Sequence, residues 1–169
     1  NGFNDLFGHI RMIYAREKAK RALLEEFKEH VLSVVATPED LIEKVLEPYA
    51  DSYLIAKSQQ YVSTKNAEDV NRLLKWLNRI DNSDWLPPAI LFLSQEKDHP
   101  EYVLWFFTKL ERLAAYLHIC AKNVNQRIER YAEVIASLQA PHSKDAPAVS
   151  VELTKAEIRD LSRRLGLPT

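Results

Sequence analysis

Histidine and cysteine are the residues of this sequence with the widest chemical range, because both types bind metals and exchange protons. No two histidines stand three or four positions apart, the spacing that puts two ligands on one helix face. Glu26 and His30 share such a face, but two ligands do not make a metal site. Cys120 is the one cysteine, which excludes an internal disulfide and a cysteine-rich zinc site. We predict a core position for Cys120 and surface or hydrogen-bonded positions for His9, His30, His99, His118 and His142.

Motifs that bind phosphate or activate a nucleophile are also missing from the sequence. It has no glycine-rich phosphate loop, no nucleophile elbow and no His-Glu-x-x-His pair. Three glycines in 169 residues are too few for the tight turns of sandwiches, barrels and nucleotide-binding folds. We therefore predict no catalytic residue, no cofactor and no metal in this segment, and an independent enzyme ranks last among the functions considered.

Two clusters of basic residues remain as candidates for binding. Residues 16–21 carry four basic side chains close to several glutamates, which favours a solvated surface. The second cluster consists of Lys122, Arg127 and Arg130 and is called the basic end below. A net charge of −1 excludes a globally basic DNA-binding protein. Residues 108–169 nevertheless carry ten Lys and Arg against seven Asp and Glu, so a local phosphate-facing surface is compatible with the sequence.

The basic end is therefore our candidate contact surface for DNA or for a neighbouring domain. A break in the helical pattern exposes the start of a helix that Asn125 is expected to cap, and free N–H groups there attract phosphate or carboxylate. Arg127 and Arg130 are expected to point away from the core, so that reversing both charges would abolish DNA binding and spare the fold. The alternative is that both are ordinary exposed helix charges, with Arg130 paired to Glu133.

The elements that must hold these residues are helices. Apolar residues recur every three or four positions through almost the whole sequence, which is the helical period. The longest apolar run, from Pro100 to Ala121, predicts a buried central helix that includes Trp105 in its core face. We predict an all-α fold: a multi-helix bundle around this one long central helix, with a short C-terminal linker and a tail helix.

Capping residues and prolines locate the helix boundaries. Thr37 and Asn66 are capping residues, and prolines after Asp84 stand where only a first helical turn tolerates them. Pro48 is expected to kink or restart the helix that begins after Thr37. Residues 154–157 form a capping box for the tail helix.

The character of the sequence changes at residue 140. We assign residues 1–140 to the helical bundle domain and residues 141–153, which have two prolines and no periodicity, to a linker. Residues 154–169 are assigned to the start of a following C-terminal region that is truncated here, because the chain begins with Asn1 and looks like part of a longer protein. No charged region followed by an apolar run occurs near Asn1, so we expect no signal peptide, and charges interrupt the longest apolar stretch. We therefore expect no membrane span and a cytoplasmic location.

Several stretches of the sequence resemble a known family. The main ones are WLPPAILFL at 85–93, LERLAAYL at 110–117 and NQRIERY at 125–131. With IRMIY at 10–14, LLEEF at 23–27 and LTKAE at 153–157, they are similar to the central helical region of the GmrSD-like, modification-dependent restriction proteins. The resemblance extends over most of the chain.

This resemblance implies a three-part protein with a ParB-like, nucleotide-hydrolysing N-terminal domain, a helical middle and a C-terminal HNH nuclease. Neither a DGQQR-like nucleotide stretch nor an HILPQ-like nuclease stretch is present, and His142 is no substitute. The implied function is a non-catalytic connecting module, whose partners are the flanking ParB-like and HNH domains and DNA. The alternative is a stand-alone helical protein–protein interaction domain with no role in nucleic-acid binding.

Overall fold

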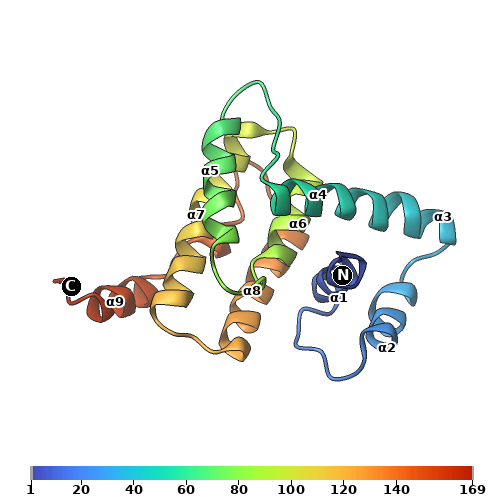
Figure 1. Cartoon of the computed structure of the whole chain (residues 1–169), viewed down its shortest axis with the longest axis horizontal. Helices are drawn as coiled ribbons and strands as arrows, with labels where there is room; N and C mark the ends of the chain where they lie inside the picture. The colour runs from blue at the N-terminus through green and yellow to red at the C-terminus, as the bar shows by residue number, and fades with distance from the viewer. Residues whose placement is uncertain (1, 169) are drawn as a thin grey trace.

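The computed structural model describes residues 2–168, and all regular secondary structure in that range is helical (Figure 1). No strand occurs in that range, so the all-α prediction is confirmed. The α-helices are α1 (Gly2–Ala15), α2 (Leu23–Phe27), α3 (Pro38–Asp40), α4 (Glu47–Ser58), α5 (Ala67–Asn78), α6 (Leu86–Glu96), α7 (Pro100–Ile119), α8 (Val124–Gln139) and α9 (Lys155–Arg164).

Two wide π-helical turns interrupt the first half of the chain. The first, η1 (Lys28–Leu32), continues α2, and the second, η2 (Leu41–Leu46), joins α3 to α4. The predicted restart at Pro48 takes this form, because α4 begins one residue before the proline and directly after η2. A proline has no N–H to donate and its ring clashes with the carbonyl four residues earlier. The wide turn before Pro48 lets the chain stay helical in spite of both.

Most of the predicted caps are present. Thr37 Oγ1 accepts a hydrogen bond from the Asp40 N–H at 3.1 Å, and Thr154 forms its capping box with Glu157. Asn66 precedes α5 in a left-handed conformation, with φ of 66°, but its side chain makes no capping bond. The prediction that Asn125 caps the last bundle helix is wrong, because Asn123 does so two residues earlier.

The long helix α7 contributes to the main core as predicted, but the helix enclosed by its neighbours is α6, in which every residue from Leu86 to Leu93 is buried. Phe92 of α6 stacks on Phe106 of α7, with ring centroids 3.9 Å apart and planes only 4° from parallel. Trp85, just before α6, is 1% exposed. Trp105 was predicted to lie in the core face, but it is only partly buried and packs at the edge beside Lys109, whose Nζ lies 5.9 Å from its ring centroid.

A second, smaller core forms at the other end of the molecule. Its buried residues come from α1, α2, η1 and η2, and they are Leu6, Ile10, Phe27, Val31 and Val45. Figure 1 shows α1 end-on between α4 and α2, while α9 projects from the opposite end of the longest axis. The N-terminal helices and the tail helix are therefore the two extremities of the structure.

Residues 141–153, which the sequence assigns to a linker, fold back against α7. Tyr102 Oη accepts a hydrogen bond from the Ala148 N–H at 3.0 Å and lies 2.9 Å from His142 Nδ1. Val151, in the short 3₁₀ turn η3 (Val149–Val151), is completely buried. This segment contributes to the core, and the assignment of residues 154–169 to a separate region stays a prediction. None of the helices in residues 2–168 combines the length and apolar character that crossing a bilayer requires.

Candidate functional site

Arg127 of the basic end joins α8 to the segment before α6. Its Nε donates to Asp84 Oδ2 at 2.7 Å, and its Nη1 donates to the carbonyl oxygen of Lys122 at 2.9 Å. Asp84 therefore binds this arginine, and Trp85 occupies the capping position of α6 without a side-chain cap. Arg127 retains one fifth of its side-chain exposure (21%), so most of its donors face the protein.

Arg130 is enclosed by the segments that follow α8. Its Nε and Nη2 donate to the two carboxylate oxygens of Glu157 on α9, at 2.9 and 3.1 Å. Its Nη1 also donates to the carbonyl oxygen of Ser150 at 2.7 Å, and its Nη2 to that of Glu152 at 2.9 Å. The predicted ion pair with Glu133 is also present, with Arg130 Nη1 3.6 Å from Glu133 Oε2. With 10% of its side chain exposed, Arg130 does not point into solvent, and that part of the prediction is wrong.

Lys122 completes the connection to the tail helix. Its Nζ lies 3.1 Å from Asp160 Oδ2, to which Tyr116 Oη donates at 3.1 Å. Hydrogen bonds from Lys122 and Tyr116 lower the pKa of Asp160. Partial burial acts to raise the pKa of Glu157, but the hydrogen bond and charge of Arg130 outweigh it and lower that pKa. Both carboxylates of this junction are thus ionised at neutral pH.

The basic end is consequently an internal junction of the chain. The start of α8 is closed as well, because Asn123 Oδ1 accepts from the Gln126 N–H and Gln126 Oε1 accepts from the Asn123 N–H, both at 2.9 Å. Few donors remain there for an external anion. Contact of these residues with DNA stays a prediction, and their shown partners are Asp84, Glu157 and Asp160.

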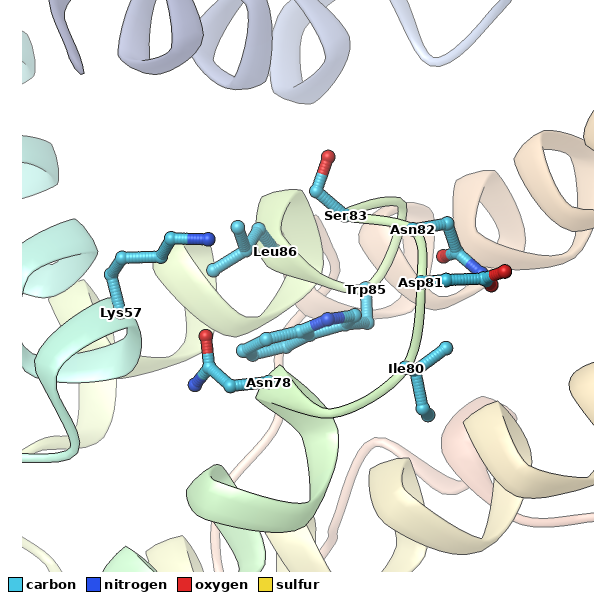
Figure 2. A pocket seen from close by; sticks show the side chains of 8 residues that line it. All are labelled: Lys57, Asn78, Ile80, Asp81, Asn82, Ser83, Trp85 and Leu86. Atoms are coloured by element: carbon cyan, nitrogen blue, oxygen red, sulfur yellow. The ribbon is translucent and has the colours of Figure 1, made fainter.

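A polar cavity of about 270 Å³ lies between the ends of α4 and α5 and the loop before α6 (Figure 2). Figure 2 shows the Trp85 ring at its centre, with Lys57 on one side and Asp81 on the other. The Asn78 amide is anchored, because its Nδ2 donates to the carbonyl oxygens of Ala56 and Leu74. No histidine lines this cavity beside Ser83, so the lining has no pair of nucleophile and base.

A second cavity, of about 290 Å³, lies beside α1 and contains His9 and Arg11 in its lining. Burial lowers the pKa of His9 to about 4, which keeps its ring neutral at pH 7. Arg11 is 5% exposed and donates from Nε to Glu26 Oε1 at 2.9 Å. Its Nη2 lies 2.9 Å from the same oxygen but without hydrogen-bond geometry. Sequence reasoning missed this buried pair, although an arginine between Ile10 and Met12 was a signal.

Glu26, Glu29 and His30 form the arrangement closest to a metal site in residues 2–168, with their ligand atoms within 4.8 Å of one another. Two arginines already neutralise its carboxylates. Arg11 and Arg21 both pair with Glu26, and Arg21 also contacts Glu29. These guanidinium groups repel a divalent cation. The cluster is explained as an ion-pair network between α1 and α2.

An apolar groove at the N-terminal end is the feature that sequence reasoning missed most clearly. It has a volume of about 610 Å³, and its lining, from α1, α2, η1 and η2, consists of Asn4, Phe7, Leu23, Leu24, Phe27, Leu32, Leu41 and Leu46. Leu24 is 65% exposed and Leu32 is 40% exposed. These leucines recur at helical spacing, which is typical of a core face, but between the wide turns η1 and η2 they surround an open groove.

Comparison of this chain with protein-family models, with curated proteins and with solved structures gave no match.

Proposed function

We propose that this chain is a non-catalytic helical connecting module of a GmrSD-like, DNA-targeting multidomain protein. In this proposal it lies between a ParB-like domain and an HNH nuclease, and acts in the cytoplasm on DNA that those domains bind. The resemblance at residues 85–93, 110–117 and 125–131 supports it. A connecting module needs no reacting groups of its own, and the cavity around Trp85 has no histidine beside Ser83.

The observation that carries the proposal is the attachment of α9 to the bundle by the basic end. Arg130 binds Glu157, and Lys122 binds Asp160, so two ion pairs on neighbouring turns hold one face of α9. Two separate anchors fix both the position and the direction of a helix. A domain that continued from α9 would therefore be held in a defined orientation relative to the bundle, which is the work of a connector.

The experiment uses the full-length protein from the reading frame that contains this segment. We expect it to cut DNA in the presence of a divalent metal, and the chain of residues 1–169 alone to cut none. Arg130→Met should slow cleavage by the full-length protein while its helical signal is retained. Arg112→Met is the matched control, because Arg112 is exposed on α7 and makes no ion pair in the described part of the chain.

Two results would contradict the proposal. One is a reading frame that encodes neither flanking domain. The other is metal-dependent cleavage by residues 1–169 alone, abolished by a point change within them. The alternative, a helical protein–protein interaction domain without a nucleic-acid role, is favoured by one observation, the apolar groove. The same full-length experiment separates the two, since an interaction domain alone has no effect on DNA cleavage.

A further inference from the structure

We infer that the apolar groove binds helix α9 of a second copy of this chain, so that copies associate head to tail. This inference rests on the two ends of the molecule and is independent of the proposed function. Its chemistry is that of a helix in a groove, with apolar anchors on one helix face and charges beside them.

The tail helix offers an apolar face that its own chain leaves uncovered. Ile158 and Leu165, seven residues apart and therefore on one face, are 50% and 51% exposed. Leu167, just beyond the helix, is 55% exposed. Arg130 and Lys122 hold α9 through Glu157 and Asp160, so the helix can present its apolar face without leaving the bundle.

The segment that supplies most of the groove lining and the tail helix carry opposite net charges. Residues 22–47 contain seven Asp and Glu against two Lys, whereas residues 155–164 contain four Lys and Arg against two Asp and Glu. In the groove segment, ion pairs within the chain use Glu26, Glu29 and Asp40. In α9 the ion pairs use its two acidic residues, Glu157 and Asp160. The charged residues left without an ion pair in the described part of the chain are Glu25, Lys28, Glu39, Glu43 and Glu47 on one side and Lys155, Arg159, Arg163 and Arg164 on the other.

These two surfaces lie at opposite ends of the molecule's longest axis (Figure 1). A chain therefore cannot place its own α9 in its own groove, and the contact must form between copies. The surfaces are different, so the association is heterologous and leads to a ring or an open row of copies. A symmetric contact of groove against groove would instead bring like charges together, which is unfavourable.

The charge pattern also determines how the association should respond to salt. The excess of carboxylates beside the groove and the excess of cations on α9 attract each other at low ionic strength, and salt screens exposed charges of this kind. We expect the weight-average mass of the wild-type chain to rise with concentration at low salt and to fall towards 19.5 kDa when salt is added. Sedimentation equilibrium of the 169-residue chain measures both effects.

Two variants, each defective in one surface, provide the decisive test. Arg159→Glu with Arg163→Glu alters only α9, and Leu24→Asp alters only the groove, where its 65% exposure spares the fold. Each variant alone should associate about tenfold more weakly or not at all. Mixed together they should form a one-to-one complex that does not grow further, because only one intact junction can form. Arg112→Glu, exposed on α7, is the matched control and should associate as the wild type does.

Circular dichroism confirms that each variant remains helical before its mass is measured. A wild-type chain that stays monomeric at submillimolar concentration and low salt overturns the inference. So does an α9 variant that still dimerises, since that result assigns the groove to a symmetric contact. A mixture of the two defective variants that stays monomeric also overturns it.

Discussion

Arg130 and Glu157 form a bidentate pair between two helices, with Nε–Oε2 and Nη2–Oε1 distances of 2.9 and 3.1 Å across 27 residues of sequence. Paired donors of this kind fix direction as well as distance, because a planar guanidinium matches a carboxylate in only a few orientations. The same guanidinium holds two backbone carbonyls of the segment between the helices. One side chain thus organises everything that follows α8.

Replacing Arg130 with methionine should destabilise the chain. The change keeps much of the side-chain volume but leaves the Glu157 carboxylate, which is 14% exposed, without its partner. We expect a loss of about 2–4 kcal/mol in the free energy of unfolding, below the full cost of a buried pair because α9 can swing into water. Urea denaturation measures the loss, and limited proteolysis should show faster cleavage within residues 141–153. An unchanged denaturation midpoint, with Arg112→Met as the control, would contradict this.

Reversing the charges of Arg127 and Arg130 together should damage the fold. The sequence predicted that this double change would leave it intact, but the structure places Asp84 and Glu157 against the two guanidinium groups. Two new carboxylates would then lie in contact with two existing ones, and like charges in a partly buried site repel strongly. Loss of helical signal or of a cooperative thermal transition checks this. A double variant as stable as the wild type would show that the ion pairs contribute nothing.

Replacing a tryptophan with alanine should destabilise the chain more when its side chain is more deeply buried. Trp85→Ala removes a side chain that is 1% exposed and should cost about 3–5 kcal/mol. Trp105→Ala should cost less than half as much, because this ring, which the sequence placed in the core face, is only partly buried. Chemical denaturation of the two variants side by side gives the comparison. Equal losses would mean that Trp105 packs as tightly as Trp85.

Stability should depend on the protonation of His9. Burial lowers its pKa in the folded chain to about 4 from 6.5, so the unfolded chain binds the proton first as the pH falls. Stability from this group is fully present above pH 6.5, and acidification towards pH 4 removes up to about 1.4 kcal/mol per pH unit. His9→Gln should flatten the curve between about pH 4 and 6.5. A wild-type curve that is already flat over this range would refute the assignment.

The local features of the fold could be predicted because short segments of sequence determine them. The helical period located α7, and Thr37 and Thr154 marked helix starts that their own neighbours complete. The cap of α8 was also available in the sequence, since Gln126 stands three residues after Asn123 and completes a capping box there. The prediction that Asn125 is the cap did not take the pairing of Asn123 with Gln126 into account.

The surroundings of the candidate site could not be predicted in the same way. Arg130 lies off the face of α8 that packs on α6, so the helical period places it in solvent. It is covered by Ser150, Glu152 and Glu157, which come 20 to 27 residues later in the chain. The Arg11–Glu26 pair has the same character, because a bend between two helices brings its members together. The periodicity of one helix does not show which later segments of the chain will cover its surface.

The wide turns η1 and η2 have a consequence for the length of the sequence around them. A π-helical turn holds one more residue than an α-helical turn, which makes it equivalent to a single-residue insertion. Deleting one residue between 41 and 46 would let that turn close into an ordinary α-helix. Both kinds of turn complete one full rotation, so the helix before it would keep nearly the same direction relative to α4. The segment that lines the groove would be one residue shorter, so the shape of the open groove depends on residue count as well as on residue type.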